Sequence, residues 1–133
     1  MSTQKTKVWL VTGCSTGFGR YIAEHLLEAG EQVVVTARKS DKIADLEQKG
    51  DALILPLDVI DRDQCQKVVD AAEAQFGRID VLINNAGIGF FGAIEETPEA
   101  DARRLFDVNF FGVANTIHSV LPHMRARRSG TSI

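Results

Sequence analysis

Glycines and small polar residues gather in one stretch near the start of the chain, Thr12-Gly13-Cys14-Ser15-Thr16-Gly17-Phe18-Gly19. The apolar run Val8–Val11 precedes this stretch, and apolar residues at helical spacing follow it. The glycines therefore lie where a buried strand passes into a helix, whose first N–H groups lack partners within the helix. Those groups and the helix dipole favour an anion, and glycine lets a phosphate approach the main chain closely. The pattern predicts a phosphate-binding turn.

The spacing of these glycines is Gly-x-x-x-Gly-x-Gly. This spacing matches neither the Gly-x-Gly-x-x-Gly dinucleotide fingerprint nor the phosphate loop that ends in Lys-Ser/Thr. A tight turn with no ligand is therefore an alternative, because short motifs match falsely with ease. The interpretation depends on which other polar groups the fold brings to the same place.

Two basic residues, Arg38 and Lys39, follow the β-branched run at 32–37. In dinucleotide-binding folds this position reads the adenosine ribose: an acidic residue accepts from the 2′-hydroxyl of NAD, whereas an arginine accommodates the 2′-phosphate of NADP. No carboxylate ends this run, and a guanidinium can bind a phosphate in bidentate fashion. Arg38 therefore favours NADP. The alternative is a pair of solvated charges on a loop.

Polar side chains also follow the apolar runs at 52–57 and 80–83. Asp58 ends the first of these, and its carboxylate can accept from the exocyclic amine of adenine or stabilise an ordinary turn. Asn84-Asn85-Ala86-Gly87 ends the second. Each buried amide needs a partner, since leaving one unpaired costs roughly 1–3 kcal/mol. These amides brace neighbouring strands, contact a ligand, or do both.

A further amide lies in the last predicted helix. Thr97 is the predicted N-cap of this helix, and Pro98 is its predicted first residue. Asn109 falls on the apolar stripe of the helix, between Leu105 and Val113. A polar amide on a buried face must be satisfied by backbone, water or a ligand. Asn109 is therefore a candidate functional residue.

These residues are positioned by strands and helices that alternate along the chain. Apolar runs at 8–11, 32–37, 52–57 and 80–83 predict strands, 130–133 begins a fifth, and helical patterns separate them, including a weak one at 41–49 and a stronger one at 61–76. Alternation of this kind gives parallel pairing through right-handed crossovers. The predicted fold class is α/β, a doubly wound, Rossmann-like parallel sheet that binds ligands beyond the carboxyl ends of its strands. Pro56 indicates a strand end or an edge strand.

Composition limits the function classes. A chain of 133 residues is expected to form one domain, and its formal net charge of −3 argues against nucleic acid as the main partner. No apolar run approaches the ~20 residues of a membrane-spanning helix, so no membrane association is expected. Cys14 and Cys65 show no metal-like spacing, so we expect no metal and a reducing, cytoplasmic setting.

In combination, these motifs resemble the short-chain dehydrogenase/reductase family, in particular its hydroxysteroid-dehydrogenase-like branch. The resemblance implies NADP as the cofactor and makes Asn109 the asparagine of the catalytic tetrad. It also implies that the full-length parent is a homo-oligomer that acts on a small alcohol or ketone. The residues that it assigns to the cofactor are Gly13, Ser15, Thr16, Gly17, Phe18, Gly19, Arg38, Asp58, Val59, Asn85, Ala86 and Gly87.

The chain departs from this family in length. We expect residues 1–133 to form a partial dinucleotide-binding domain, cut as the fifth strand begins, with the fourth strand left as an open edge. The family's chemistry needs a serine and a Tyr-x-x-x-Lys pair, and the one tyrosine here is Tyr21, in the first helix. We therefore expect this chain alone to be inactive toward carbonyl substrates. The alternatives are a noncatalytic NADP-binding sensor or interaction module, and a structural remnant without a ligand.

Overall fold

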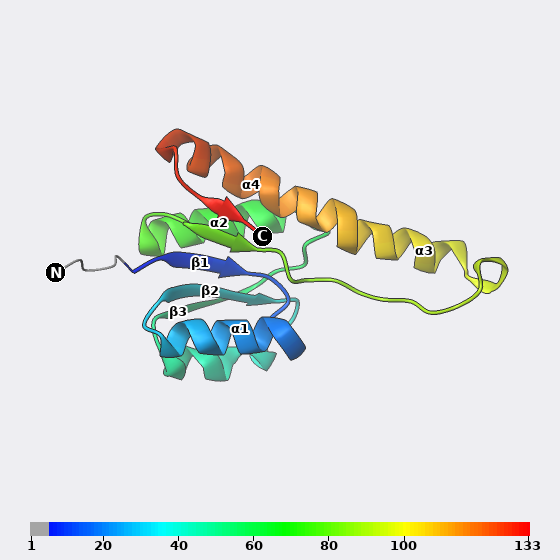
Figure 1. The fold of residues 1–133 in the computed structure, drawn as a ribbon, viewed down its shortest axis with the longest axis horizontal. Helices are drawn as coiled ribbons and strands as arrows, with labels where there is room; N and C mark the ends of the chain where they lie inside the picture. The colour runs from blue at the N-terminus through cyan, green and yellow to red at the C-terminus, as the bar shows by residue number, and fades with distance from the viewer. Residues whose placement is uncertain (1–5) are drawn as a thin grey trace.

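β-Branched and other apolar residues build a central parallel sheet, in a computed structural model that describes residues 6–133 (Figure 1). The strand order is β3-β2-β1-β4-β5, and every neighbouring pair is parallel. The strands are β1 (Val8–Val11), β2 (Gln32–Ala37), β3 (Ala52–Pro56), β4 (Val81–Ile83) and β5 (Thr131–Ser132). The order runs outward from β1 in both directions, which is the topology of a doubly wound sheet. The predicted α/β, Rossmann-like class is confirmed.

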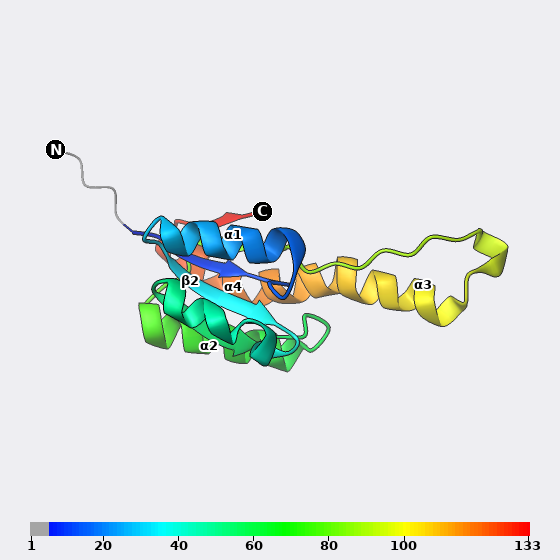
Figure 2. The ribbon, with the colours of Figure 1, turned by 90° about the horizontal axis from the view of Figure 1, so that it is seen from below.

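Helices cover both faces of this sheet, as Figures 1 and 2 show. One face is covered by α1 (Gly17–Glu28), and the other by α2 (Arg62–Phe76) and α4 (Gly112–Arg127). Successive residues of a strand point to opposite faces. Accordingly Leu10 packs in the core on the side of α2 and α4, whereas Val11 packs in the core on the side of α1. Burial on both faces explains why these strands are continuous apolar runs.

The segment at 41–49 does not form the single α-helix that its pattern predicts. Two 3₁₀ helices replace it, η1 (Ser40–Lys42) and η2 (Ala44–Lys49). Ile43, with φ −120° and ψ 3°, separates them. Ile43 and Leu46 are both fully buried, and residues three apart align on one side of a 3₁₀ helix. Core packing of this pair therefore favours the tighter helix.

The last predicted helix begins later than expected and is not uniform. Pro98 has ψ 136° and precedes α3 (Glu99–Phe106), and Thr97 donates its hydroxyl to the Ala93 carbonyl at 2.8 Å instead of capping the helix. A π-helical turn, η4 (Asp107–Phe111), joins α3 to α4. In Figures 1 and 2, α3 and the segment before it project from the body of the molecule.

The edges of the sheet are β3 and β5. Pro56 therefore lies in an edge strand, as its type predicts. The fourth strand is not an open edge, contrary to expectation, because Val81 pairs with Thr131 and Leu82 with Ser132.

None of the helices within residues 6–133 has both the length and the apolar character needed to cross a bilayer.

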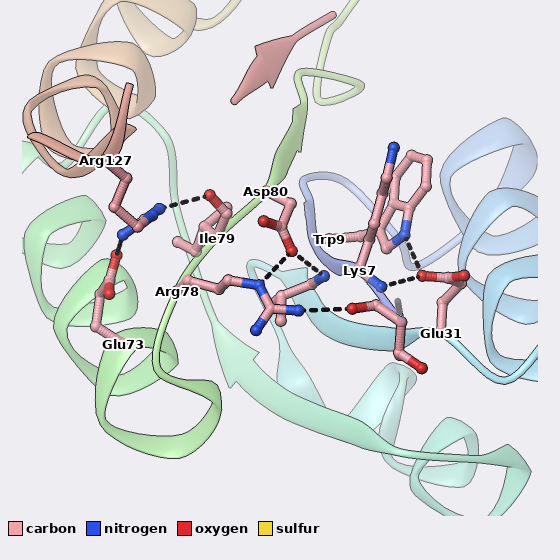
Figure 3. A network of polar contacts seen from close by, with 10 residues as sticks. Lys7, Trp9, Glu31, Glu73, Arg78, Ile79, Asp80 and Arg127 are labelled. Atoms are coloured by element: carbon pink, nitrogen blue, oxygen red, sulfur yellow. Dashed lines mark hydrogen bonds and ion pairs between the residues drawn. The ribbon is translucent and has the colours of Figure 1, made fainter. Parts of the chain in front are cut away.

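A polar network joins the strands at their amino ends (Figure 3). The Glu31 carboxylate accepts from the backbone N–H of Lys7 at 2.6 Å. The Asp80 carboxylate accepts from the backbone N–H of Val8 at 2.8 Å and from Arg78 Nε at 2.8 Å. These bonds tie β1 to the residues that precede β2 and β4. At this end of the sheet Glu31 therefore binds a backbone N–H and the Trp9 indole N–H, and Asp80 pairs with Arg78.

Candidate functional site

A groove of about 310 Å³ lies at the opposite end of the sheet, where the strands end. Its walls come from the ends of β1 to β4 and from the helical segment that includes α3 and η4. Nine of the twelve residues predicted to bind the cofactor line it: Gly13, Ser15, Thr16, Arg38, Asp58, Val59, Asn85, Ala86 and Gly87. The fold thus gathers four separate sequence motifs in one place.

Gly13 closes the floor of the groove at the end of β1. Its φ of +69° lies in the left-handed region that favours glycine. A Cβ atom at this position would lie 2.8 Å from Ala86 Cα, closer than real contacts allow. Any side chain here would both strain the turn and push β1 away from the segment that follows β4. Gly13 is therefore required by conformation and by space.

Gly17, Phe18 and Gly19 form the first turn of α1 and do not line the groove. Phe18 is 83% exposed, so its side chain lies outside the site. A Cβ atom on Gly19 would collide with the Gly13 carbonyl and the Asn85 amide, so Gly19 permits close packing of helix on loop. These three residues can contribute to the site through the backbone.

The start of α1 is open to an anion. The N-cap Thr16 has an extended backbone, and its side chain makes no capping hydrogen bond. The first turn carries no acidic residue. The positive end of the helix dipole is therefore not neutralised by a side chain of the first turn, and Thr16 itself lines the groove.

Thr12 braces the site from below, a role that the sequence analysis did not assign to it. Its side chain is buried, and its hydroxyl accepts from the backbone N–H groups of Asn85 at 3.0 Å and Ala86 at 2.9 Å. The Asn85 Nδ2 donates in turn to the Gly13 carbonyl at 3.1 Å. These bonds lock the end of β1 to the end of β4. The sequence signal for this role was a hydroxyl-bearing residue, Thr12, directly before the first glycine of the loop.

The two neighbouring asparagines have different roles. Asn85 lines the groove and braces the glycine loop. Asn84 faces the other way: its Oδ1 accepts from the Thr116 hydroxyl at 2.5 Å, and its Nδ2 donates to Ser132 Oγ at 3.4 Å. Asn84 therefore ties β4 to α4 and β5. Of the alternatives left open for this pair, bracing alone describes Asn84, whereas Asn85 braces the glycine loop and also lines the groove.

A second, basic hollow of about 430 Å³ adjoins the groove. Ser15, Arg38, Lys39 and Lys42 line it, and the first two also line the groove. No carboxylate is among these lining residues. Three cations thus face a space that opens beside the loop after β1, which is an environment suited to a phosphate.

Arg20 does not join this basic cluster. Its guanidinium pairs with Glu24 at 3.0 Å and with Asp45. The hydrogen bond from Arg20 lowers the pKa of the Asp45 carboxyl. The ion pair with Asp45 holds α1 to η2.

Asp58 stabilises a turn, as one interpretation of its position predicts, and its contact with adenine stays a prediction. It lines the groove, and its Oδ1 accepts from the Ile60 N–H at 3.3 Å across a short turn. Asp61 is the side-chain cap of α2, accepting from the Gln64 N–H at 3.1 Å. Val59 is held against α4, because its carbonyl accepts from Asn115 Nδ2 at 2.9 Å.

Asn109 lies in the π-helical turn η4 and not among the residues that line the groove. Its carboxamide binds the backbone of Ile88 in both directions, with Nδ2 donating to the carbonyl at 2.7 Å and Oδ1 accepting from the N–H at 2.8 Å. Asn109 thereby holds the segment that forms one wall of the groove. π-Helical turns are frequent at functional sites.

Neither cysteine is poised as a nucleophile. Both are buried, and burial raises the pKa of the Cys14 thiol to about 11 and that of Cys65 to about 11. For Cys65 the carboxylates of Asp61 and Asp58 add to this effect. Thiols with such pKa values stay protonated near neutral pH and do not act as ligands or nucleophiles.

Five groove residues were not predicted from the sequence: Ala37, Leu57, Ile88, Arg104 and Val108. Ala37, Leu57 and Ile88 are direct neighbours of predicted residues, so strand-end position was a signal for them. Arg104 and Val108 line the groove from the α3–η4 segment, and no local pattern reveals that this segment lies beside the groove.

Comparisons with known proteins identify this arrangement. The family model described as short chain dehydrogenase matches residues 7–133. Oxidoreductase BOA17 of Botryotinia fuckeliana is 40% identical over 94% of this chain and 47% of its own length. The 11-beta-hydroxysteroid dehydrogenase-like 2 protein of Arabidopsis thaliana is 33% identical over 90% of this chain and 41% of its own length.

Solved structures agree with these relatives. A short-chain dehydrogenase from Streptomyces avermitilis superposes with a TM-score of 0.89 at 45% identity, over 96% of this chain and 48% of that one. A metagenomic short-chain oxidoreductase in complex with NADP superposes with a TM-score of 0.87 at 32% identity, over 95% of this chain and 60% of that one. The chain spans about half the length of the curated relatives that it matches, and it belongs to the short-chain dehydrogenase/reductase family.

Proposed function

We propose that this chain binds NADP(H) in the groove and supplies the nucleotide-binding part of an oxidoreductase that acts on an alcohol/ketone pair. The observation that carries the proposal is that the groove and the basic hollow share two lining residues, Ser15 and Arg38, and so lie next to each other. An elongated ligand with a flat base and separated phosphates fits two such adjacent spaces. The metagenomic short-chain oxidoreductase that was solved in complex with NADP has the same fold and supports this assignment.

The residues present fit the pyrophosphate of a dinucleotide. An added Cβ at Gly13 would lie 2.8 Å from Ala86 Cα, so the bare backbone of this glycine lets the end of β1 pack against the segment after β4 at the groove. The uncapped start of α1 offers backbone N–H groups and the positive end of the helix dipole. Ser15 and Thr16, which line the groove beside it, add hydroxyl donors. We assign the pyrophosphate to this corner.

The residues also fit the 2′-phosphate that distinguishes NADP from NAD. Arg38, Lys39 and Lys42 line the basic hollow, and Arg38 reaches it from the end of β2, the position that reads the adenosine ribose. An NAD-selective site carries an acidic residue here, which would repel a phosphate. We therefore assign NADP(H) as the preferred form, with Arg38 as the principal ligand of the 2′-phosphate.

The adenine belongs at the end of the groove formed by Asp58 and Val59. The Asp58 carboxylate accepts from the exocyclic amine, and the apolar side chains of Val59, Ala37 and Leu57 enclose the ring. Bound NADPH would supply a hydride for the reduction of a carbonyl group. Within this chain, Asn109 orders the wall on which the dinucleotide rests, by holding the backbone of Ile88.

Calorimetric titration of the protein with NADPH, NADH and adenosine 2′,5′-bisphosphate tests the proposal. We expect NADPH to bind more tightly than NADH by at least tenfold, which corresponds to about 1.4 kcal/mol. The bisphosphate, which carries the 2′-phosphate without the nicotinamide, should compete with NADPH. Equal affinity for NADPH and NADH would refute the assignment of the basic hollow, and no binding of either would refute the proposed function.

A further inference from the structure

Arg104 is the second basic residue, besides Arg38, among the residues that line the groove. It enters from α3 and lines the groove together with Asp58, Val59 and Val108. Within residues 6–133 its side chain makes no hydrogen bond or ion pair. The preceding residue, Arg103, differs: its Nε pairs with Glu99 at 2.8 Å, within α3. Of these two adjacent arginines, Arg103 is therefore paired within its own helix, whereas Arg104 lines the groove.

Helical spacing sets the place of Arg104. It precedes Val108 by four residues, so both lie on the same side of the α3–η4 segment. Val108 is buried in the core cluster that includes Val59. Arg104 therefore lies one turn farther out along the same wall, above the apolar end of the groove and at its exposed rim.

We propose that Arg104 positions the adenine of the bound dinucleotide by stacking its guanidinium on the ring. The inference rests on the proposed function and assigns one more residue to that site. A planar guanidinium stacks on aromatic faces, and the attraction strengthens when the pair is shielded from water. The apolar wall of Val59 and Val108 contacts the ring from within, and Arg104 covers it from the solvent side.

This role differs from that of Arg38. Adenine is common to NADPH and NADH, so stacking by Arg104 stabilises both dinucleotides equally. Arg38 contacts the 2′-phosphate and acts on NADPH alone. Loss of Arg104 should therefore change affinity without changing the preference between the two cofactors.

The test compares Arg104→Ala with the matched control Arg103→Ala, which removes the same charge from the same helix. Dissociation constants are measured for NADPH, NADH and adenosine, with adenosine followed by NMR titration because it carries no phosphate. Arg104→Ala should weaken all three by about tenfold and leave the NADPH/NADH ratio unchanged. Arg103→Ala should leave all three within twofold of the wild type.

A third variant, Arg104→Lys, separates stacking from charge. Lysine keeps the positive charge but lacks the planar group, so we expect most of the affinity loss to remain. Full affinity in Arg104→Lys, or weaker NADPH binding with unchanged adenosine binding, would overturn the inference in favour of a phosphate contact. Unchanged binding in Arg104→Ala would also overturn it, with the proposed function intact. Failure of the wild type to bind NADPH would overturn the proposed function and the inference with it.

Discussion

Asn109 and Ile88 are joined by two hydrogen bonds, through the side chain of the first and the backbone of the second. The distances are 2.7 Å from Asn109 Nδ2 to the Ile88 carbonyl and 2.8 Å from the Ile88 N–H to Asn109 Oδ1. The Asn109 carboxamide thus satisfies the backbone N–H and carbonyl of Ile88, which lies in an irregular segment with no neighbouring strand within residues 6–133 to pair with. Through this pair, a residue outside the groove fixes the shape of the groove wall.

Replacement of Asn109 by Ala removes both bonds. We expect the free energy of unfolding to fall by about 1 kcal/mol, because a net hydrogen bond of this kind contributes roughly 0.5–1.5 kcal/mol and water reaches the Ile88 backbone. NADPH affinity should fall as well, since Ile88 lines the groove. Urea unfolding and NADPH titration measure the two effects.

A suitable control for this variant is Gln66→Ala. Gln66 donates to Asp70 at 2.9 Å on the exposed side of α2, far from the groove lining. Gln66→Ala should change the free energy of unfolding by less than ~0.5 kcal/mol and leave NADPH binding unchanged. Nucleotide affinity as strong in Asn109→Ala as in Gln66→Ala would show that the Asn109–Ile88 pair does not shape the site.

Gly13→Ala should prevent nucleotide binding and destabilise the fold. Its φ of +69° costs a side-chain-bearing residue roughly 1–2 kcal/mol, and the added methyl would meet Ala86 Cα at 2.8 Å. Gly30→Ala is the matched control, because Gly30 has φ +84° but no atom near its would-be Cβ. The difference between the losses of unfolding free energy in Gly13→Ala and in Gly30→Ala measures the cost of the close contact with Ala86 alone. Equal losses would contradict a tight contact between Gly13 and Ala86.

Stability should decline between about pH 9 and pH 11 because of the two cysteines. Burial raises the pKa of both thiols from an ordinary 9.0 to about 11. The folded state therefore keeps protons that the unfolded chain releases above pH 9, so this contribution is present below pH 9 and lost as the pH rises to 11. The urea midpoint of unfolding should be highest at pH 7.5, lower at pH 9 and lowest at pH 10.5.

The double variant Cys14→Ala, Cys65→Ala isolates this effect from that of other titrating groups. Its midpoint should fall less steeply over the same range. Parallel pH profiles for the variant and the wild type would contradict the raised pKa values. A thiol reagent should also label the folded protein slowly and the urea-unfolded protein rapidly, because both thiols are buried.

The 133-residue chain alone should bind NADPH without oxidising it in the presence of model ketones. The one tyrosine, Tyr21, is 73% exposed on α1 and does not line the groove, so it cannot serve as a proton donor there. The loss of NADPH absorbance at 340 nm follows turnover. A ketone-dependent rate above background, retained in Tyr21→Phe, would show that another group in these residues performs the proton transfer.

The sheet could be predicted from the sequence because its strands are apolar on both faces and end in polar motifs. Glycine at a strand–helix junction, Arg38 after β2 and Asp58 after β3 all lie at the carboxyl edge, where the topology must bring them together. The capping of α2 by Asp61 is an equally local interaction, because Asp61 accepts from the N–H three residues along the chain. Local chemistry was sufficient for these features.

Other features depended on tertiary contacts. The burial of Ile43 and Leu46 replaced an α-helix with 3₁₀ turns. The last turn of α3 meets the groove and brought in Arg104, which has no direct sequence neighbour among the lining residues. Arg20, which directly follows the last glycine of the loop, pairs with Asp45 of η2 instead of joining the basic hollow. In each case the deciding partner is distant in the sequence.

The most direct test of the nucleotide assignment is the ratio of NADPH to NADH affinity in the wild type and in Arg38→Ala. Arg125→Ala, in the last turn of α4 and outside the groove lining, is the control for charge. A charge-assisted bond to the 2′-phosphate contributes roughly 1.5–3 kcal/mol, so Arg38→Ala should lose about ten- to a hundredfold in NADPH affinity and little in NADH affinity. The predicted result is therefore a preference for NADPH that Arg125→Ala keeps and Arg38→Ala abolishes. A preference that survives in Arg38→Ala, or a wild type that binds NADH as tightly as NADPH, would contradict the account.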